Sequence, residues 1–162
     1  MIASDYPPVG IVALQGAVTA HEQVLNALGV PHRRILRAES LDGVAGVILP
    51  GGESTAQLEL LGSDQDRFVA SLRRLAEQKR PILATCAGLI LAARWGLLNI
   101  SVVRNGWGRQ VASFEALADD GRTPLVCIRA PRITETRSPA CTVLTLRGEP
   151  IRVRQGPVVG AT

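Results

Sequence analysis

The chain has 162 residues, of which 46% are hydrophobic, a length that suffices for one domain and is too short for two comfortable ones. Its formal charge is +4, but the arginines that supply most of it are scattered with few aromatic residues between them, so we expect a solvated surface and no nucleic-acid partner. The three cysteines lack C-x-x-C spacing, and no apolar run is as long as a membrane span. The N-terminus has no targeting pattern. We therefore expect a cytoplasmic protein with no membrane segment.

The first half of the chain alternates short apolar runs with amphipathic stretches, which is typical of a parallel sheet covered by helices. The apolar runs predict strands at 9–14, 33–36, 44–50 and 82–85. A helix is predicted over 19–29, burying Val24, Leu25 and Leu28 and ending at Gly29. A longer helical region precedes Pro81, because its apolar residues fall on one face at helical spacing: Phe68, Val69, Leu72, Leu75 and Ala76.

The second half begins with a helix predicted over 87–94 and then changes to β-like segments. These segments cover 98–103, 111–116, 125–130 and 141–146. A turn at Gly148 and Glu149 leads to two further apolar runs at 151–156 and 158–162, which indicate a hairpin followed by one more strand.

Three glycine-rich or special turns directly follow predicted strands: "LQG" (14–16), "PGGES" (50–54) and "TCAG" (85–88). The carboxyl ends of parallel strands share one edge of a sheet, so these turns are expected to meet there although they are far apart in the sequence. That edge is the predicted active site.

Cys86 lies where a predicted strand turns directly into a helix. This resembles a nucleophile elbow, in which the helix dipole favours thiolate and the N–H of Ala87 can donate to an oxyanion. A cysteine in an apolar setting is more often an inert core residue, and the turn alone leaves both interpretations open. "PGGES" favours the first, since two glycines allow close backbone approach to a ligand, although Ser54 or Thr55 would equally cap an ordinary helix.

Six segments then occur in order from about residue 9 to the last residue: "ALQGAVTAHEQVLNALG", "ILPGGEST", "TCAGLILAA", "RNGWGRQVASFEA", "IRAP" and "RQG". In this order the chain resembles the glutaminase subunits of pyridoxal 5′-phosphate synthase, which are class I, triad-type glutamine amidotransferases. "PGGES" is typical of the wider class, whereas "RNxxGRQ" with "SFE" and "IRAP" is specific to this branch. The resemblance implies a flavodoxin-like three-layer α/β/α fold with a mostly parallel sheet, and a single amidotransferase domain over 1–162.

The resemblance also implies an activity: hydrolysis of L-glutamine to L-glutamate and ammonia, with the ammonia passed to a TIM-barrel synthase partner. Cys86 matches the nucleophile, and Gly52 and Ala87 match the oxyanion hole. "LQG" matches a segment beside the site that couples partner docking to activation. No metal or bound cofactor is implied. The positions that match the glutamine-binding residues are Gly52, Glu53, Ser54, Arg104, Ile128 and Arg129. Each arginine taken alone would more often be a surface residue.

The sequence departs from this family at several places. The activating histidine and its glutamate belong to an H-P-E triplet expected directly after Thr162, where the sequence ends, so we expect a chain that is C-terminally incomplete relative to the family. His21 and His32 are expected to be structural. Ala84 stands where the class usually has glycine, and the segment 91–98 is shorter than in the family.

These departures keep a second hypothesis open, namely a catalytically impaired subunit that docks on the synthase and binds glutamine. Loss of a triad base typically lowers the rate by about 10⁴ to 10⁶, so binding would exceed hydrolysis. Another cysteine hydrolase of the same fold is a weaker alternative, because the "RNxxGRQ" and "IRAP" matches disfavour it.

Overall fold

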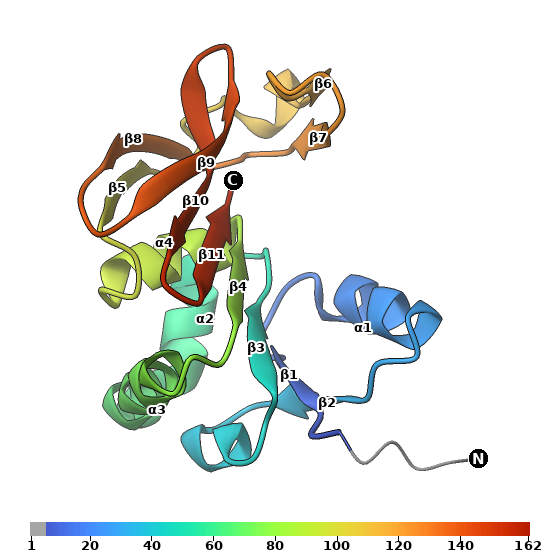
Figure 1. Ribbon diagram of the computed structural model, residues 1–162, viewed down its shortest axis with the longest axis vertical. Helices are drawn as coiled ribbons and strands as arrows, with labels where there is room; N and C mark the ends of the chain where they lie inside the picture. The colour runs from blue at the N-terminus through green and yellow to red at the C-terminus, as the bar shows by residue number, and fades with distance from the viewer. Residues whose placement is uncertain (1–5) are drawn as a thin grey trace.

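The computed structural model describes residues 6–162, and a seven-stranded sheet lies at its centre (Figure 1). Residues 1–5, part of the N-terminal segment without a targeting pattern, lie outside the described residues. The first five strands across the sheet run parallel and the last two pairings are antiparallel, which confirms the predicted mostly parallel sheet. In spatial order the strands are β2 (His32–Ile35), β1 (Val9–Val12), β3 (Gly46–Leu49), β4 (Ile82–Thr85), β11 (Val158–Ala161), β10 (Glu149–Gln155) and β9 (Cys141–Leu146).

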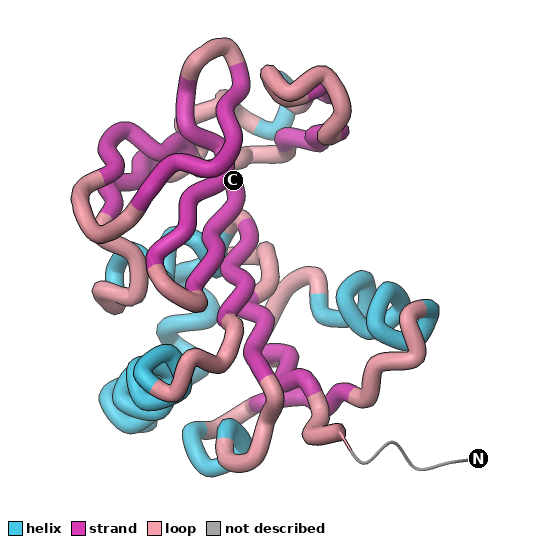
Figure 2. The backbone as a smooth tube through the Cα atoms, viewed as in Figure 1, coloured by secondary structure: helices cyan, strands magenta, loops and turns pink. Residues whose placement is uncertain are grey.

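Helices cover both faces of the sheet, as the ribbon and the tube both show (Figures 1 and 2). On one face α1 (Val18–Ala27) packs against Ile11 and Ile48. The alternate strand residues, such as Val12 and Leu49, point into the larger core on the other face. That core is covered by α2 (Ser54–Leu61), α3 (Gln65–Glu77) and α4 (Ala87–Arg94). The predicted three-layer α/β/α architecture is therefore confirmed.

The burial predicted for the first helix is wrong at two of three positions. Leu25 is buried, but Val24 and Leu28 are 57% and 69% exposed. Helix α1 meets the sheet along a narrow stripe in which Val18 and Leu25, seven residues apart, point inward. Val24 and Leu28 lie outside that stripe and therefore face solvent.

The apolar face predicted for the longer helix is confirmed in α3. Phe68, Leu72 and Leu75 are buried in the main core. The Phe68 ring lies 6.2 Å, centroid to centroid, from the ring of Trp95, which follows α4. This contact joins two helices on the same face of the sheet.

The second half forms two small antiparallel pairs beside the main sheet. Strand β5 (Ile100–Val103) pairs with β8 (Arg132–Thr136), and β6 (Phe114–Leu117) pairs with β7 (Pro124–Cys127). Residues 110–112 form a short 3₁₀ helix, η3 (Gln110–Ala112), so the strand predicted over 111–116 starts too early. Strand β8 was not predicted, because three of its five residues are charged or exposed polar side chains. Two further 3₁₀ helices are η1 (Ala38–Leu41) and η2 (Gly62–Asp64).

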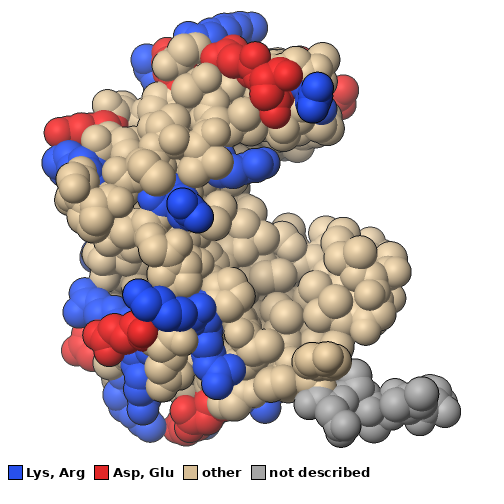
Figure 3. Space-filling view, viewed as in Figure 1, with Lys and Arg blue, Asp and Glu red and all other residues tan. Residues whose placement is uncertain are grey.

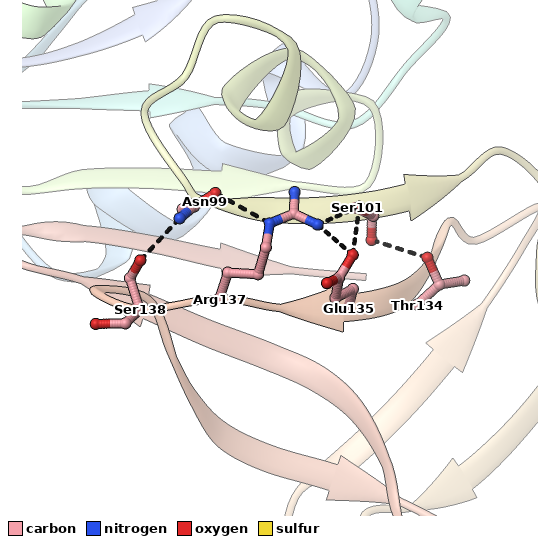
Figure 4. A network of polar contacts seen from close by, with 6 residues as sticks. All are labelled: Asn99, Ser101, Thr134, Glu135, Arg137 and Ser138. Atoms are coloured by element: carbon pink, nitrogen blue, oxygen red, sulfur yellow. Dashed lines mark hydrogen bonds and ion pairs between the residues drawn. The ribbon is translucent and has the colours of Figure 1, made fainter.

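A polar network ties β5 to β8 (Figure 4). Asn99 Nδ2 donates to the Ser138 carbonyl at 2.8 Å, and Arg137 Nε donates to Asn99 Oδ1 at 3.3 Å. Arg137 also donates to Ser101 Oγ at 3.0 Å and pairs with Glu135. The network fixes the strand whose next residue is Arg104, one of the predicted site residues.

No helix within residues 6–162 is both long enough and apolar enough to cross a membrane.

Phe68→Ala is predicted to lower the free energy of unfolding by about 3–5 kcal/mol, because it removes a fully buried ring and leaves a cavity. Leu60→Ala is the matched control, since Leu60 lies on α2 and is 60% exposed; its effect should stay within about 0.5 kcal/mol. Urea unfolding measures both. Equal effects of the two substitutions would contradict the described core.

Candidate active site

An open pocket lies at the carboxyl edge of the parallel strands, with a cavity volume of about 440 Å³. This size suits a small molecule. Figure 3 shows the molecule hollowed between the part that carries β6 and β7 and the part that carries α1, and the pocket residues come from both sides of that hollow. They are Gln15, Ala17, Gly51, Gly52, Glu53, Ser54, Cys86, Ala87, Ile90, Arg104, Asn105, Ile128 and Arg129.

Every site residue predicted from the sequence lines this pocket. The sheet order explains why. Strands β1 and β3 are neighbours, but the chain leaves β1 toward α1 on one face and leaves β3 toward α2 on the other, so a crevice opens between their ends. Strand β4 lies next to β3 and ends at Cys86 in the same crevice.

Cys86 occupies a sharp turn between β4 and α4. Its backbone φ is 48°, in the left-handed region that non-glycine residues seldom adopt. Its N–H donates to the carbonyl of Ala161 at 2.9 Å, which continues the ladder between β4 and β11. At Gly88 a Cβ would collide with the backbone carbonyl of Leu49, so α4 starts directly against β3. The turn is therefore held by backbone on both sides.

The electrostatics of Cys86 differ from the sequence expectation. Burial raises the pKa of the thiol, and this effect exceeds all others. The backbone N–H groups of Ala87 and Gly52 face the sulfur and lower the pKa, as does the positive charge of Arg129, while Glu53 raises it. The net pKa lies above its usual value. The thiolate is therefore not favoured overall at this turn, because desolvation outweighs the two N–H groups and the charge of Arg129.

The loop after β3 is fixed to the loop after β1. The N–H of Ala17 donates to the Gly51 carbonyl at 2.9 Å, and the N–H of Glu53 donates to Gln15 Oε1 at 2.6 Å. In a trans peptide the carbonyl of Gly51 and the N–H of Gly52 point in opposite directions. Holding that carbonyl toward Ala17 thus directs the N–H of Gly52 toward Cys86.

Glu53 joins two arginines on the opposite side of the pocket. Its carboxylate pairs with Arg104 and, at 3.3 Å, with Arg129. Arg104 Nη1 also donates to Thr55 Oγ1 at 3.0 Å. These side chains are 36–50% exposed, so the pairs are weak and the guanidinium groups stay accessible to a ligand.

Neither histidine of the chain lines the pocket. His21 lies on α1, where burial lowers its pKa, and His32 begins β2, one residue earlier than predicted. Within residues 6–162 no group of three or more His, Cys, Asp or Glu side chains is placed to hold a metal ion.

Sequence reasoning missed four residues at or beside the site. Ala17, Ile90 and Asn105 line the pocket, and Asn105 follows Arg104 with a backbone φ of 51°. Gln57 lies beneath the loop after β3 and is buried. The sequence offers no clear signal for Gln57, because the stretch "AQLELL" directly after "PGGEST" contains a second polar residue, Glu59.

Comparison with known proteins gives a consistent result. The profile of the SNO glutamine amidotransferase family matches residues 11–162. The chain is 41% identical over 162 residues to pyridoxal 5′-phosphate synthase subunit PdxT of Moorella thermoacetica, covering 91% of this chain and 85% of the relative. It is 37% identical to the subunit of the same name from Bacillus pumilus, covering 95% and 84%.

Solved structures agree on the fold. A crystal structure of a glutamine amidotransferase superposes with a TM-score of 0.84 at 32% identity, covering 94% of this chain and 87% of that one. The structure of PurLQS from Thermotoga maritima gives a TM-score of 0.72 at 16% identity, covering 97% and 86%, which supports the fold alone.

The pH dependence of Cys86 alkylation by iodoacetamide tests the electrostatics. Because its pKa is raised, the thiolate fraction at neutral pH should be smaller than that of a free cysteine, and the rate should reach half its maximum above the usual pH of about 8.5. A Cys141→Ser background removes the exposed thiol, and Cys86→Ser in that background gives the residual rate of Cys127. A midpoint well below the ordinary value would contradict the dominance of burial.

Proposed function

The chain belongs to the SNO glutamine amidotransferase family, and on this premise we propose that it hydrolyses L-glutamine to L-glutamate and ammonia. We propose that the ammonia goes to a pyridoxal 5′-phosphate synthase partner, because the relatives are named as subunits of that synthase. The observation that carries the proposal is the position of Cys86. Its sulfur lies at a strand-to-helix turn, faces two backbone N–H groups, and shares one pocket with Glu53 and two arginines.

The charges of the pocket suit an α-amino acid. Arg104 and Arg129 offer guanidinium groups that can hold a carboxylate, and the Glu53 carboxylate can accept hydrogen bonds from an α-ammonium group. Ser54 and Ile128 complete the wall of the pocket. Fixed at that end, the side-chain amide of glutamine extends toward Cys86.

The reaction follows from nucleophilic catalysis at the thiol. A base removes the thiol proton, and the sulfur attacks the amide carbon of glutamine. The N–H groups of Gly52 and Ala87 stabilise the oxyanion that forms. The C–N bond breaks as the nitrogen takes a proton and leaves as ammonia. Water then adds to the thioester, releases glutamate and restores the thiol.

The partner we propose is a TIM-barrel synthase subunit, with no nucleic acid involved, and the proposed compartment is the cytoplasm. The three cysteines are unpaired, which fits a reducing environment. We propose that the chain acts as one amidotransferase domain and needs no metal or cofactor of its own.

Two observations favour a second candidate, a glutamine-binding subunit with little hydrolysis. No histidine lines the pocket among residues 6–162, and burial raises the pKa of the Cys86 thiol. The two candidates share the binding pocket and differ only in turnover. Assays of ammonia release and of glutamine binding on the same preparation separate them.

Cys86→Ala is predicted to lower glutamine-dependent ammonia release in the presence of the synthase by about 10⁴-fold or more, because it removes the nucleophile. Glutamine binding, measured by calorimetry, should change by less than about threefold, corresponding to less than ~1 kcal/mol. Cys141→Ser is the control and should leave the rate unchanged, since Cys141 is exposed on β9 away from the pocket. Turnover that survives Cys86→Ala would rule out the proposed mechanism. Saturable binding without turnover in the unsubstituted chain would favour the second candidate.

Arg104→Ala is predicted to weaken glutamine binding by about 10- to 100-fold, the range expected for loss of a hydrogen bond to a charged group. Arg104→Lys should lose less, although a single ammonium cannot form the bidentate contact. Arg94→Ala is the matched control, because Arg94 is exposed at the far end of α4. Equal dissociation constants for glutamine in the Arg104 and Arg94 variants would show that Arg104 does not contribute to glutamine binding.

A further inference from the structure

Gln57 is a buried polar residue that the mechanism does not use. It lies on α2 one turn after Glu53, and only 2% of its surface is exposed. Its Nε2 donates to the backbone carbonyl of Gln15 at 2.7 Å. Its Oε1 is buried and has no hydrogen-bond partner among the described residues. Burying an amide with one unsatisfied group is unfavourable, so this position gains little stability from a polar side chain.

The bond made by Gln57 is a third contact to the loop at 15–17, and it comes from α2, while the other two come from the loop at 51–53. The other two are Ala17 N–H to the Gly51 carbonyl and Glu53 N–H to Gln15 Oε1. Gln15 is thus held at two points, with its backbone carbonyl bound to Gln57 and its side-chain oxygen bound to Glu53. Gln15 is otherwise exposed, so its position depends on these contacts.

The loops at 15–17 and 51–53 are packed so closely that neither can move without displacing the other. A Cβ at Gly52 would lie 2.5 Å from Gln15 Oε1 and 2.9 Å from Gly16 Cα, and at Gly16 it would collide with the Gly51 carbonyl. A shift of the loop at 15–17 must therefore move the peptide between Gly51 and Gly52. That peptide carries the N–H that faces the Cys86 sulfur.

We propose that Gln57 is a positioning residue for the oxyanion loop: by holding the Gln15 carbonyl from below, it keeps the N–H of Gly52 directed at Cys86. Gln57 lines no part of the pocket among the described residues and touches neither Cys86 nor Gly52 in any hydrogen bond, so it acts only through Gln15. The inference rests on the proposed function, because the loop matters for catalysis only if Cys86 is the nucleophile.

The test is the pH profile of Cys86 alkylation by iodoacetamide in the Cys141→Ser background. The midpoint of this profile responds to the N–H beside the sulfur and does not depend on turnover. A failure of this proposal can therefore be distinguished from a failure of the proposed function. Gln57→Met keeps the length of the side chain, removes the donor and suits a buried position. It should move the midpoint of the profile upward by about half a unit to one unit, because loss of a hydrogen bond to the thiolate disfavours it. At neutral pH this is about a three- to tenfold slower reaction.

Leu61→Met is the matched control. Leu61 is buried on the same helix, in the main core, and the substitution conserves volume. Its alkylation profile should coincide with that of the unsubstituted chain. Thermal unfolding of both variants separates a local effect from a general loss of stability.

Gln57→Leu is a second variant of similar volume, which cannot donate to the Gln15 carbonyl and adds no charge, and it should show the same upward shift. An upward shift in every Gln57 variant that folds, without one in Leu61→Met, supports the proposal. A folded Gln57 variant whose profile matches that of the unsubstituted chain overturns it. If both Gln57 variants fail to fold while Leu61→Met folds, Gln57 serves the fold and not the loop, and the proposal is equally overturned.

Discussion

The close contact between residues 15–17 and 51–53 is the constraint on which the site depends. Backbone meets backbone there, so glycine is required at Gly16 and Gly52, and hydrogen bonds from Ala17 and Glu53 set the orientation of the peptides. The contact exists because β1 and β3 are neighbours whose following helices lie on opposite faces of the sheet. The sheet topology thus determines that the N–H of Gly52 points toward the Cys86 sulfur.

The position of Cys86 combines two opposing requirements. A partly buried nucleophile gains from hydrogen bonds that water screens only weakly, but the same burial disfavours the thiolate. Two N–H groups and one arginine do not offset that desolvation in the described structure. In the mechanism we propose, the same donors hold the oxyanion once charge moves from sulfur to substrate. On that proposal the site is better matched to the tetrahedral intermediate than to the resting thiolate, which is the condition for catalysis by differential binding.

The sequence predicted the parts of this site that depend on local pattern. The strand at 82–85 and the helix at 87–94 have the predicted bounds, because Pro81 and the apolar runs on either side of Cys86 leave few alternatives. The convergence of three distant turns followed from the rule for parallel sheets, and the named pocket residues followed from the family resemblance. Tertiary effects were not accessible: the exposure of Val24 and Leu28, the polar strand β8, and the sign of the Cys86 pKa all depend on what packs against each residue.

The ion pairs of Glu53 explain how the pocket can be ordered and still accept a charged substrate. Without a ligand, one carboxylate holds two guanidinium groups in place, which limits the side-chain entropy lost on binding. The cluster carries a net positive charge, so an incoming carboxylate is attracted and not repelled. Because all three side chains are partly exposed, releasing the arginines from Glu53 costs little. In the binding mode we propose, the Glu53 carboxylate is then free to receive the ammonium group, and each charge of the substrate meets one of opposite sign.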